Sequence, residues 1–197
     1  AGVHATLKHF VGYSASTAGR NHAPVHAGPR EIADVFLPPF EMAVREAGAR
    51  SVMNSYTDID GVPVAADPTY LTDLLRDAWG FDGVVVSDYF SVAFLETMQQ
   101  VAADRGAAAM LALRAGIDVE LPSADAYPLL ADLVREGTLE ADTVDIAVAR
   151  VLMQKERLGL LDETFEGSPS SIDLDAPGDR ALARALAEES LVLLSND

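Results

Sequence analysis

The sequence of 197 residues contains no cysteine, which excludes disulfide bonds and thiolate metal sites. Basic residues are few, 14 against 31 acidic ones, and the net charge of −17 at pH 7 repels nucleic acid and anionic membrane surfaces. No apolar run approaches the roughly 20 residues that a transmembrane helix needs. We therefore expect neither nucleic acid nor a membrane as a partner. The compartment stays open, with a cytoplasmic location slightly favoured over secretion; the absence of a basic-then-apolar leader does not decide it, because the sequence opens in mid-pattern.

Histidine is also scarce, and the placement of the four histidines excludes two common hydrolase types. Gly-Tyr-Ser-Ala-Ser (12–16) approximates the nucleophile elbow of serine hydrolases, but the required later histidine is missing because the last one is His26. His22 and His26 are four residues apart, but Pro24 prevents the helix that would bring both to a zinc ion. There is no glycine-rich phosphate loop followed by lysine. We predict no metal and no nucleotide cofactor.

Hydrophobic residues make up 49% of the sequence. They form short apolar runs that alternate with segments of helical period. This alternation is typical of parallel βα units and predicts an α/β fold. The predicted strands are Ala5–Val11, Arg50–Asn54, Val84–Asp88 and Ile117–Leu121. The predicted helices are Glu31–Ala47, bent at Pro38 and Pro39, then Pro68–Ala78, capped by Asp67, and Ala103–Ala115, Asp125–Glu136 and Thr143–Leu158.

Four such strands make about half of a closed (β/α)8 barrel, which has eight strands in roughly 250 residues. We therefore predict a partial TIM-type barrel of about four βα units over residues 1–160. The Ser/Pro/Asp-rich stretch 161–178 is predicted to be a linker. A helix at Asp179–Glu189 and a strand at Ser190–Leu194 would then begin a second domain over residues 179–197.

Polar side chains follow the predicted strands: Lys8-His9, Asn54-Ser55-Tyr56 and Ser87-Asp88. In βα barrels the carboxyl ends of the strands line the active site, so these groups are expected on one rim, with Asp118 and Glu120 beside them. A carboxylate on a rigid strand end suits a nucleophile. Asp88 could equally cap the helix that follows it, and spacing does not separate these two interpretations.

Five ordered segments resemble the N-terminal barrel domain of glycoside hydrolase family 3, the β-glucosidase and β-xylosidase family. They are Leu-Lys-His-Phe (7–10), Leu-Pro-Pro-Phe-Glu-Met-Ala-Val (37–44), Ser-Val-Met-Asn-Ser-Tyr (51–56), Leu-Thr-Asp-Leu-Leu-Arg-Asp-Ala-Trp-Gly-Phe-Asp-Gly-Val-Val-Val-Ser-Asp-Tyr (71–89) and Gly-Ile-Asp-Val-Glu-Leu-Pro (116–122). Ala-Glu-Glu-Ser-Leu-Val-Leu-Leu-Ser-Asn-Asp (187–197) resembles the beginning of the second, α/β sandwich domain of that family.

The resemblance implies a retaining hydrolysis that removes β-linked glucose or xylose from the non-reducing end. Asp88 would attack the anomeric carbon, and water would then hydrolyse the glycosyl-enzyme. Lys8 and His9 match the pair of the family that holds the sugar hydroxyls, and Arg20 resembles the arginine of the following loop. The expected partner is a small neutral sugar or oligosaccharide.

Three further residues are assigned to the substrate site by the same resemblance. Tyr56 matches a tyrosine beside the nucleophile, and Tyr89 stands where many members have a tryptophan that stacks on sugar. Met53 is counted with them, although packing explains it better than a ligand contact. Glu120 could contact substrate or close a salt bridge.

The second carboxyl group of a retaining pair, the acid/base, is not identifiable in the sequence, and in this family it commonly comes from the second domain. We therefore expect the chain alone to be nearly inactive, with the missing barrel half and sandwich domain, or self-association, completing it. One alternative is a non-catalytic half-domain with weak sugar binding. A Schiff base on Lys8, as in aldolases, is a remoter possibility.

Overall fold

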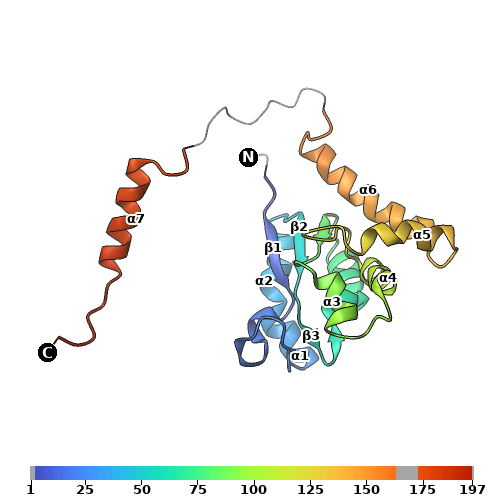
Figure 1. Ribbon diagram of the computed structural model, residues 1–197, viewed down its shortest axis with the longest axis horizontal. Coiled ribbons are helices and arrows are strands. Elements are labelled where there is room, and N and C mark those ends of the chain that lie inside the picture. The colour runs from blue at the N-terminus through green and yellow to red at the C-terminus, as the bar shows by residue number, and fades with distance from the viewer. Residues whose placement is uncertain (1–2, 163–172, 197) are drawn as a thin grey trace. The chain divides into compact units, whose positions relative to one another are not determined.

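A computed structural model describes residues 3–162 and 173–196, and the chain divides into two compact units, Ala1–Asp162 and Glu163–Asp197. The first unit contains a parallel three-stranded sheet of β1 (Thr6–Phe10), β2 (Ser51–Asn54) and β5 (Val84–Val86), in that order (Figure 1). Three of the four predicted strands are thus confirmed as a parallel sheet. The α/β fold class is confirmed with them.

The fourth predicted strand, Ile117–Leu121, is wrong as a regular strand. Only a parallel bridge between Val119 and Val86 forms, although the segment runs beside β5 through irregular backbone hydrogen bonds. The physical reason is Asp118, whose carboxylate accepts the Val85 amide at 2.8 Å in place of a backbone carbonyl. A partial barrel of four βα units therefore stays a prediction.

Helices form where the hydrophobic period predicts them, with shifted ends. The first predicted helix is three pieces, α1 (Pro29–Glu31), η3 (Ile32–Phe36) and α2 (Pro38–Arg45). The others are η5 (Thr69–Ala78), α4 (Arg105–Ala115), η6 (Tyr127–Leu129) with α5 (Leu130–Arg135), and α6 (Ala141–Arg157). Asp67 accepts the Thr69 amide at 2.9 Å, which supports its expected capping role.

Several short elements are additions to the predicted set. Helix α3 (Ser91–Thr97) begins directly after the Asp88 turn. A two-stranded hairpin of β3 (Asp58–Ile59) and β4 (Val62–Pro63) turns at Asp60 and Gly61, both with positive φ, as Asp-Gly turns commonly have. Single helical turns stand at η1 (Tyr13–Ala15), η2 (Thr17–Gly19) and η4 (Val64–Ala66).

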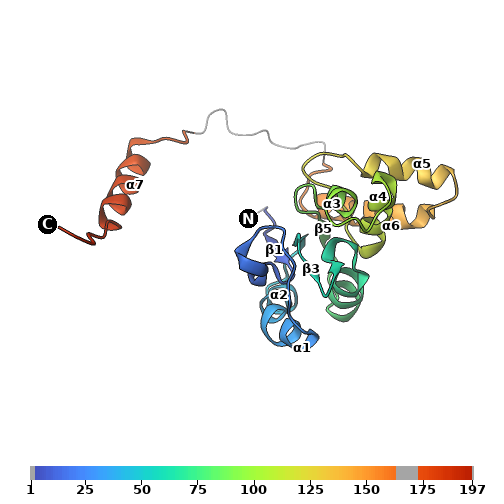
Figure 2. The same ribbon diagram turned by 60° about the horizontal axis from the view of Figure 1, so that its bottom comes forward.

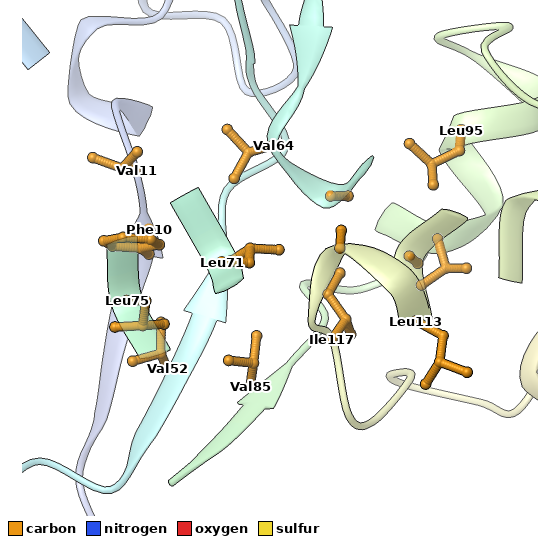
Figure 3. Packing of buried hydrophobic residues seen from close by; sticks show 14 of the residues in the cluster. Phe10, Val11, Val52, Val64, Leu71, Leu75, Val85, Leu95, Leu113 and Ile117 are labelled. Carbon is orange, nitrogen blue, oxygen red and sulfur yellow. The ribbon is translucent and has the colours of Figure 1, made fainter. Parts of the chain in front are cut away.

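One hydrophobic core joins the sheet to its helices. Leu71 and Leu75 of η5 lie over Val52 of β2 and Phe10 of β1, while Ile117 lies beside Val85 (Figure 3). Phe10 also packs edge-on against Phe40 of α2 and against Trp79. Helices α1 and α2 lie on one side of the sheet region and α3–α6 on the other (Figure 2). This packing fixes the strand ends, and the candidate site is built on them.

The second unit consists of α7 (Pro177–Glu189) and the residues around it. The predicted helix is confirmed, beginning two residues earlier than expected. The predicted strand Ser190–Leu194 is wrong, because these residues have no regular secondary structure, and the described part of this unit offers no second strand to pair with them. Most of the predicted linker, residues 163–172, lies outside the described residues.

Candidate functional site

The carboxylate of Asp88 lies two residues beyond the end of β5 and is 7% exposed. Its Oδ1 accepts the Tyr89 amide at 2.7 Å. Its Oδ2 is buried and has no hydrogen-bond partner among the described residues, and the nearest charged or basic group is Nε2 of His9, at 3.4 Å. The two oxygens of one carboxylate are therefore in different states, one held and one available.

His9 reaches Asp88 from the edge strand β1, across the intervening strand β2. Burial lowers the pKa of His9 below its ordinary value, against the opposing charge of Asp88 and with the help of Lys8. The lowered pKa favours the neutral imidazole near pH 7, and in that form the contact with Asp88 is not an ion pair. Its ring also packs against Tyr13, with 4.4 Å between ring centroids.

Lys8 is exposed on β1, next to His9 in sequence. Both residues line a pocket of about 420 Å³, together with Leu7, Gly12, Tyr13, Ser14, Val35, Phe36, Pro39 and Phe40. Asp88 is not among the lining residues, and the pocket lies between β1, the loop that follows it, η3 and α2. The structure thus brings His9 directly to Asp88 and Lys8 to the adjoining surface.

Tyr56 lies beyond the end of β2, and its hydroxyl donates to the Tyr89 carbonyl at 2.8 Å. Burial, then the nearby negative charge of Asp88 and the approach of the Tyr56 hydroxyl to that carboxylate, raise the pKa of Tyr56 well above its ordinary value, although the hydroxyl donates its hydrogen bond to Tyr89. The hydroxyl therefore stays protonated. The ring of His22 packs against Tyr56 at 4.5 Å between centroids, and Phe94 packs against both rings. An aromatic cluster thus stands beside the carboxylate.

The remaining predicted site residues, Tyr89, Met53 and Arg20, differ in their exposure and in how near they lie to Asp88 in the structure. Tyr89 follows Asp88 directly and is 52% exposed. Met53 is partly buried on β2, opposite Val86 in the last pair of the ladder and one residue before β2 ends. Arg20 is exposed in the loop after η2, where its Nε donates to the Thr17 carbonyl at 3.4 Å. Its described contacts lie within that loop and do not include Asp88.

The two acidic residues of the fourth segment have structural partners. Glu120 accepts the backbone amides of Asp125, Ala126 and Tyr127 at 2.8–3.1 Å, so neither a substrate contact nor a salt bridge is needed to explain its burial. Asp118 lies between Arg76 at 2.6 Å and Arg150 at 3.0 Å.

Sequence analysis gave no role to three residues that the structure places around Asp88. Asn54, at the end of β2, accepts the Asp88 amide, and Tyr13 and His22 cover His9 and Tyr56. For Asn54 a signal existed, since it occupies a strand end like the other candidates. Tyr13 and His22 lie in the loop after β1, whose path depends on tertiary contacts.

The described residues contain no group of three His, Cys, Asp or Glu side chains suited to a metal ion. The helices in the described ranges also include none with the length and apolar character to cross a bilayer.

Sequence comparison finds relatives over the whole chain. A model of the "Glycosyl hydrolase family 3 N terminal domain" matches residues 1–154. A β-xylosidase of Formosa agariphila is 39% identical over 98% of this chain and 28% of its own length. A β-glucosidase of Rhizobium radiobacter is 40% identical over 100% of this chain and 22% of its own length. The chain therefore spans about a quarter of the length of these relatives.

Two similar solved structures are β-glucosidases, and this chain again covers about a quarter of each. A β-glucosidase from Erythrobacter marinus superposes with a TM-score of 0.83 and 42% identity, covering 99% of this chain and 26% of that one. A β-glucosidase from Listeria innocua has a TM-score of 0.81 and 33% identity, covering 98% and 27%. The Listeria enzyme has also been solved with glucose and with gluconolactone, and a variant of it with laminaribiose.

Proposed function

This chain belongs to glycosyl hydrolase family 3, and from that premise we propose that it carries the nucleophile of a retaining β-glycosidase. The substrates would be β-linked glucosides or xylosides, cleaved at the non-reducing end. The sugar class follows the names of the relatives, which are β-glucosidases and β-xylosidases. The nucleophile is Asp88.

The observation that carries this proposal is the unequal state of the two Asp88 oxygens. Oδ1 is held by the Tyr89 amide, which orients the group, while Oδ2 is buried without a hydrogen-bond donor. A buried oxygen without a donor costs free energy, so its presence in a folded protein calls for an explanation such as a catalytic role. A nucleophile needs such an oxygen, fixed in direction and free of a proton or a tight partner.

In the proposed reaction Oδ2 attacks the anomeric carbon while the bond from that carbon to the aglycone oxygen breaks. The aglycone oxygen takes a proton from an acid/base carboxyl about 5–5.5 Å from Asp88, and a covalent glycosyl-enzyme remains. Water then gives its proton to the same acid/base and attacks the anomeric carbon. This step releases the sugar and restores the Asp88 carboxylate.

The neighbours of Asp88 receive matching roles. The neutral His9 imidazole and the Lys8 ammonium would donate hydrogen bonds to sugar hydroxyls, and the protonated Tyr56 hydroxyl would keep the Tyr89 backbone in place. Tyr89 would offer an aromatic face to the sugar ring. Arg20 and Met53 remain proposed sugar contacts that rest on the family alone.

The proposal extends to the domains. Residues 1–160 would be the later part of a (β/α)8 barrel, 161–178 a linker and 179–197 the start of an α/β sandwich domain. The outer edge of β1, with Lys8 exposed on it, would receive the missing barrel half, or a second copy of the chain. The acid/base would come from outside the chain. The second candidate is weak, non-catalytic sugar binding by the chain alone. The open edge of β1 favours it, because an incomplete barrel would lack part of the catalytic site.

Two experiments test the proposal. In the complete gene product, treatment with 2-deoxy-2-fluoro-glucosyl or xylosyl fluoride should leave a stable adduct that peptide mass spectrometry maps to Asp88; an adduct on any other residue contradicts the assignment. The 197-residue chain alone should hydrolyse aryl β-glucosides and β-xylosides far more slowly than the complete protein. Equal rates would show that the acid/base lies within residues 1–197.

A further inference from the structure

Asn54 is the last residue of β2 and is fully buried. Its side-chain carbonyl Oδ1 accepts two hydrogen bonds, from the Asp88 amide at 3.1 Å and from the Ser91 hydroxyl at 3.3 Å. Its Nδ2 donates to the carbonyl of Ser55 at 2.7 Å. One amide side chain thus ties the end of β2 to both ends of the turn 88–91.

The position of Asn54 matters because the regular pairing of β2 with β5 stops one residue earlier. The last paired residues are Met53 and Val86, so the backbone of β2 gives no ladder bond to Asp88. The Asn54 side chain supplies the next link in place of a backbone carbonyl. The turn is closed from within by the Ser91 amide, which donates to the Asp88 carbonyl at 3.1 Å.

The direction of the Asp88 carboxylate depends on that turn. Oδ1 is held by the amide of Tyr89, which is the second residue of the turn. If the turn shifts, the Tyr89 amide moves and Oδ1, which accepts its hydrogen bond, moves with it. The carboxylate then rotates, and Oδ2 no longer points in the same direction. The chain of contacts from Asn54 to the free Oδ2 therefore passes through two hydrogen bonds.

We propose that Asn54 is a positioning residue, whose side chain fixes the turn 88–91 so that Oδ2 of Asp88 is held in line for attack. Asn54 does not touch the reacting atoms itself. This inference rests on the proposed role of Asp88 as nucleophile. A displacement of about 1 Å at a reacting atom can cost roughly 100-fold in rate, so the loss of Asn54 should act on the chemical step.

The test uses Asn54→Ala and Asn54→Asp in the complete gene product, with Ser55→Ala as the matched control. Ser55 is also fully buried at the end of β2, and its hydroxyl donates to the Val11 carbonyl at 2.9 Å, away from Asp88. Three quantities are measured for each variant: the rate of covalent labelling by the 2-fluoro glycoside, the inhibition constant of free glucose or xylose, and the melting temperature.

For Asn54→Ala we expect labelling to slow by about 10–100-fold, while the inhibition constant of the free sugar changes by less than about 3-fold. Ser55→Ala should lower the melting temperature by a similar amount, since each variant loses buried hydrogen bonds, yet keep its labelling rate. Equal labelling rates in Asn54→Ala and Ser55→Ala would overturn the inference and leave Asn54 a purely structural residue.

Asn54→Asp keeps the test decisive if the alanine variant does not fold. The aspartate retains an oxygen to accept the Asp88 amide, so the turn should persist, but it adds a carboxylate beside Asp88. Its second carboxyl oxygen takes the place of Nδ2 and, when protonated, can donate to the Ser55 carbonyl as Nδ2 does. The labelling rate of Asn54→Asp should therefore be close to that of the wild type at low pH and fall as the new carboxyl ionises beside Asp88. A folded Asn54→Asp variant that labels at the wild-type rate at every pH would contradict the inference. Adduct mapping separates the two proposals, because a label away from Asp88 defeats the proposed nucleophile and not the hydrogen-bond geometry of Asn54.

Discussion

Asp88 and Asp118 are two buried aspartates in adjoining segments of the same sheet region, and they have nearly equal exposed fractions of 7% and 8%. Asp118 uses both carboxylate oxygens, with Arg76 and the Val85 amide on Oδ2 and Arg150 on Oδ1. Asp88 uses one oxygen and leaves the other without a hydrogen-bond donor in the described structure. Burial alone therefore does not separate them.

The two carboxylates differ in how many charged and hydrogen-bonding partners the fold places around them. Around Asp118 two guanidinium groups and a backbone amide satisfy the carboxylate, and such a network holds segments together. Burial lowers the pKa of Arg76, while the charge of Asp118 opposes that change. Around Asp88 the nearest basic group is a neutral imidazole, which stabilises a charge far less. The better-satisfied carboxylate serves the fold, and the poorly satisfied one is available for chemistry.

The largest expected effect is on turnover in Asp88→Asn. The asparagine keeps an oxygen for the Tyr89 amide but removes the proposed nucleophile, so activity of the complete protein should fall by at least about 1,000-fold. The free energy of unfolding in urea should change by less than about 1 kcal/mol, because few interactions stabilise the charge that is removed. Steady-state kinetics and urea unfolding measure the two effects. A variant that is inactive because it is unfolded would break the comparison.

Asp118→Asn should show the reverse profile. It leaves two arginines without their buried counter-charge, which costs about 3–5 kcal/mol of unfolding free energy. Asp132→Asn is the control, because Asp132 pairs with Arg135 on the exposed surface of α5 and such pairs contribute less than about 1 kcal/mol. Urea unfolding of the three proteins gives the result. Equal stability losses would show that Asp118 is not the better-satisfied carboxylate.

A smaller effect is expected at Phe90, two residues after Asp88. Phe90 has a φ of 65°, a left-handed conformation that disfavours bulky residues, and its side chain is 47% exposed. The ring also packs against Tyr89 and Phe94, so any small residue at this position loses that packing. Phe90→Gly should nevertheless be more stable than Phe90→Ala by about 1 kcal/mol, because only glycine adopts this φ without strain. At Val101, which has no positive φ, the order should reverse, with the alanine variant the more stable. Thermal unfolding of the four variants gives the result, and a Phe90→Ala variant at least as stable as Phe90→Gly would show that the turn carries no such strain.

The smallest effect is the pH dependence contributed by His9. Its folded pKa lies below the ordinary value of 6.5, so the unfolded chain binds more protons as pH falls through about 6.5. The stability that neutral His9 allows is complete above about pH 6.5 and declines below it, until the folded pKa is passed. His9→Gln should lose this component of the pH profile. A titration midpoint of His9 above 6.5, measured by NMR, would indicate an ion pair with Asp88 and remove the contrast with Asp118.

Much of the fold was predictable because local patterns set it. The β-branched run Val84–Val86 and the periodic helix Thr69–Ala78 follow from residue types and spacing alone. The strand at Ser190–Leu194 was not correctly predicted, because a strand forms only against a partner that local sequence does not provide. Ile117–Leu121 failed for another reason, since one carboxylate replaced a backbone acceptor.

The sequence by itself determined the order of the βα segments, the family and the choice of Asp88 as a strand-end carboxylate. Only the tertiary structure decided which oxygen of Asp88 is free, that Asn54 holds its turn, and that Asp118 and Glu120 serve the fold. The physical reason is that hydrogen-bond partners come from segments distant in the chain, 34 residues apart for Asn54 and Asp88. Residue type sets what a side chain can do, and the partners that folding brings to it set what it does.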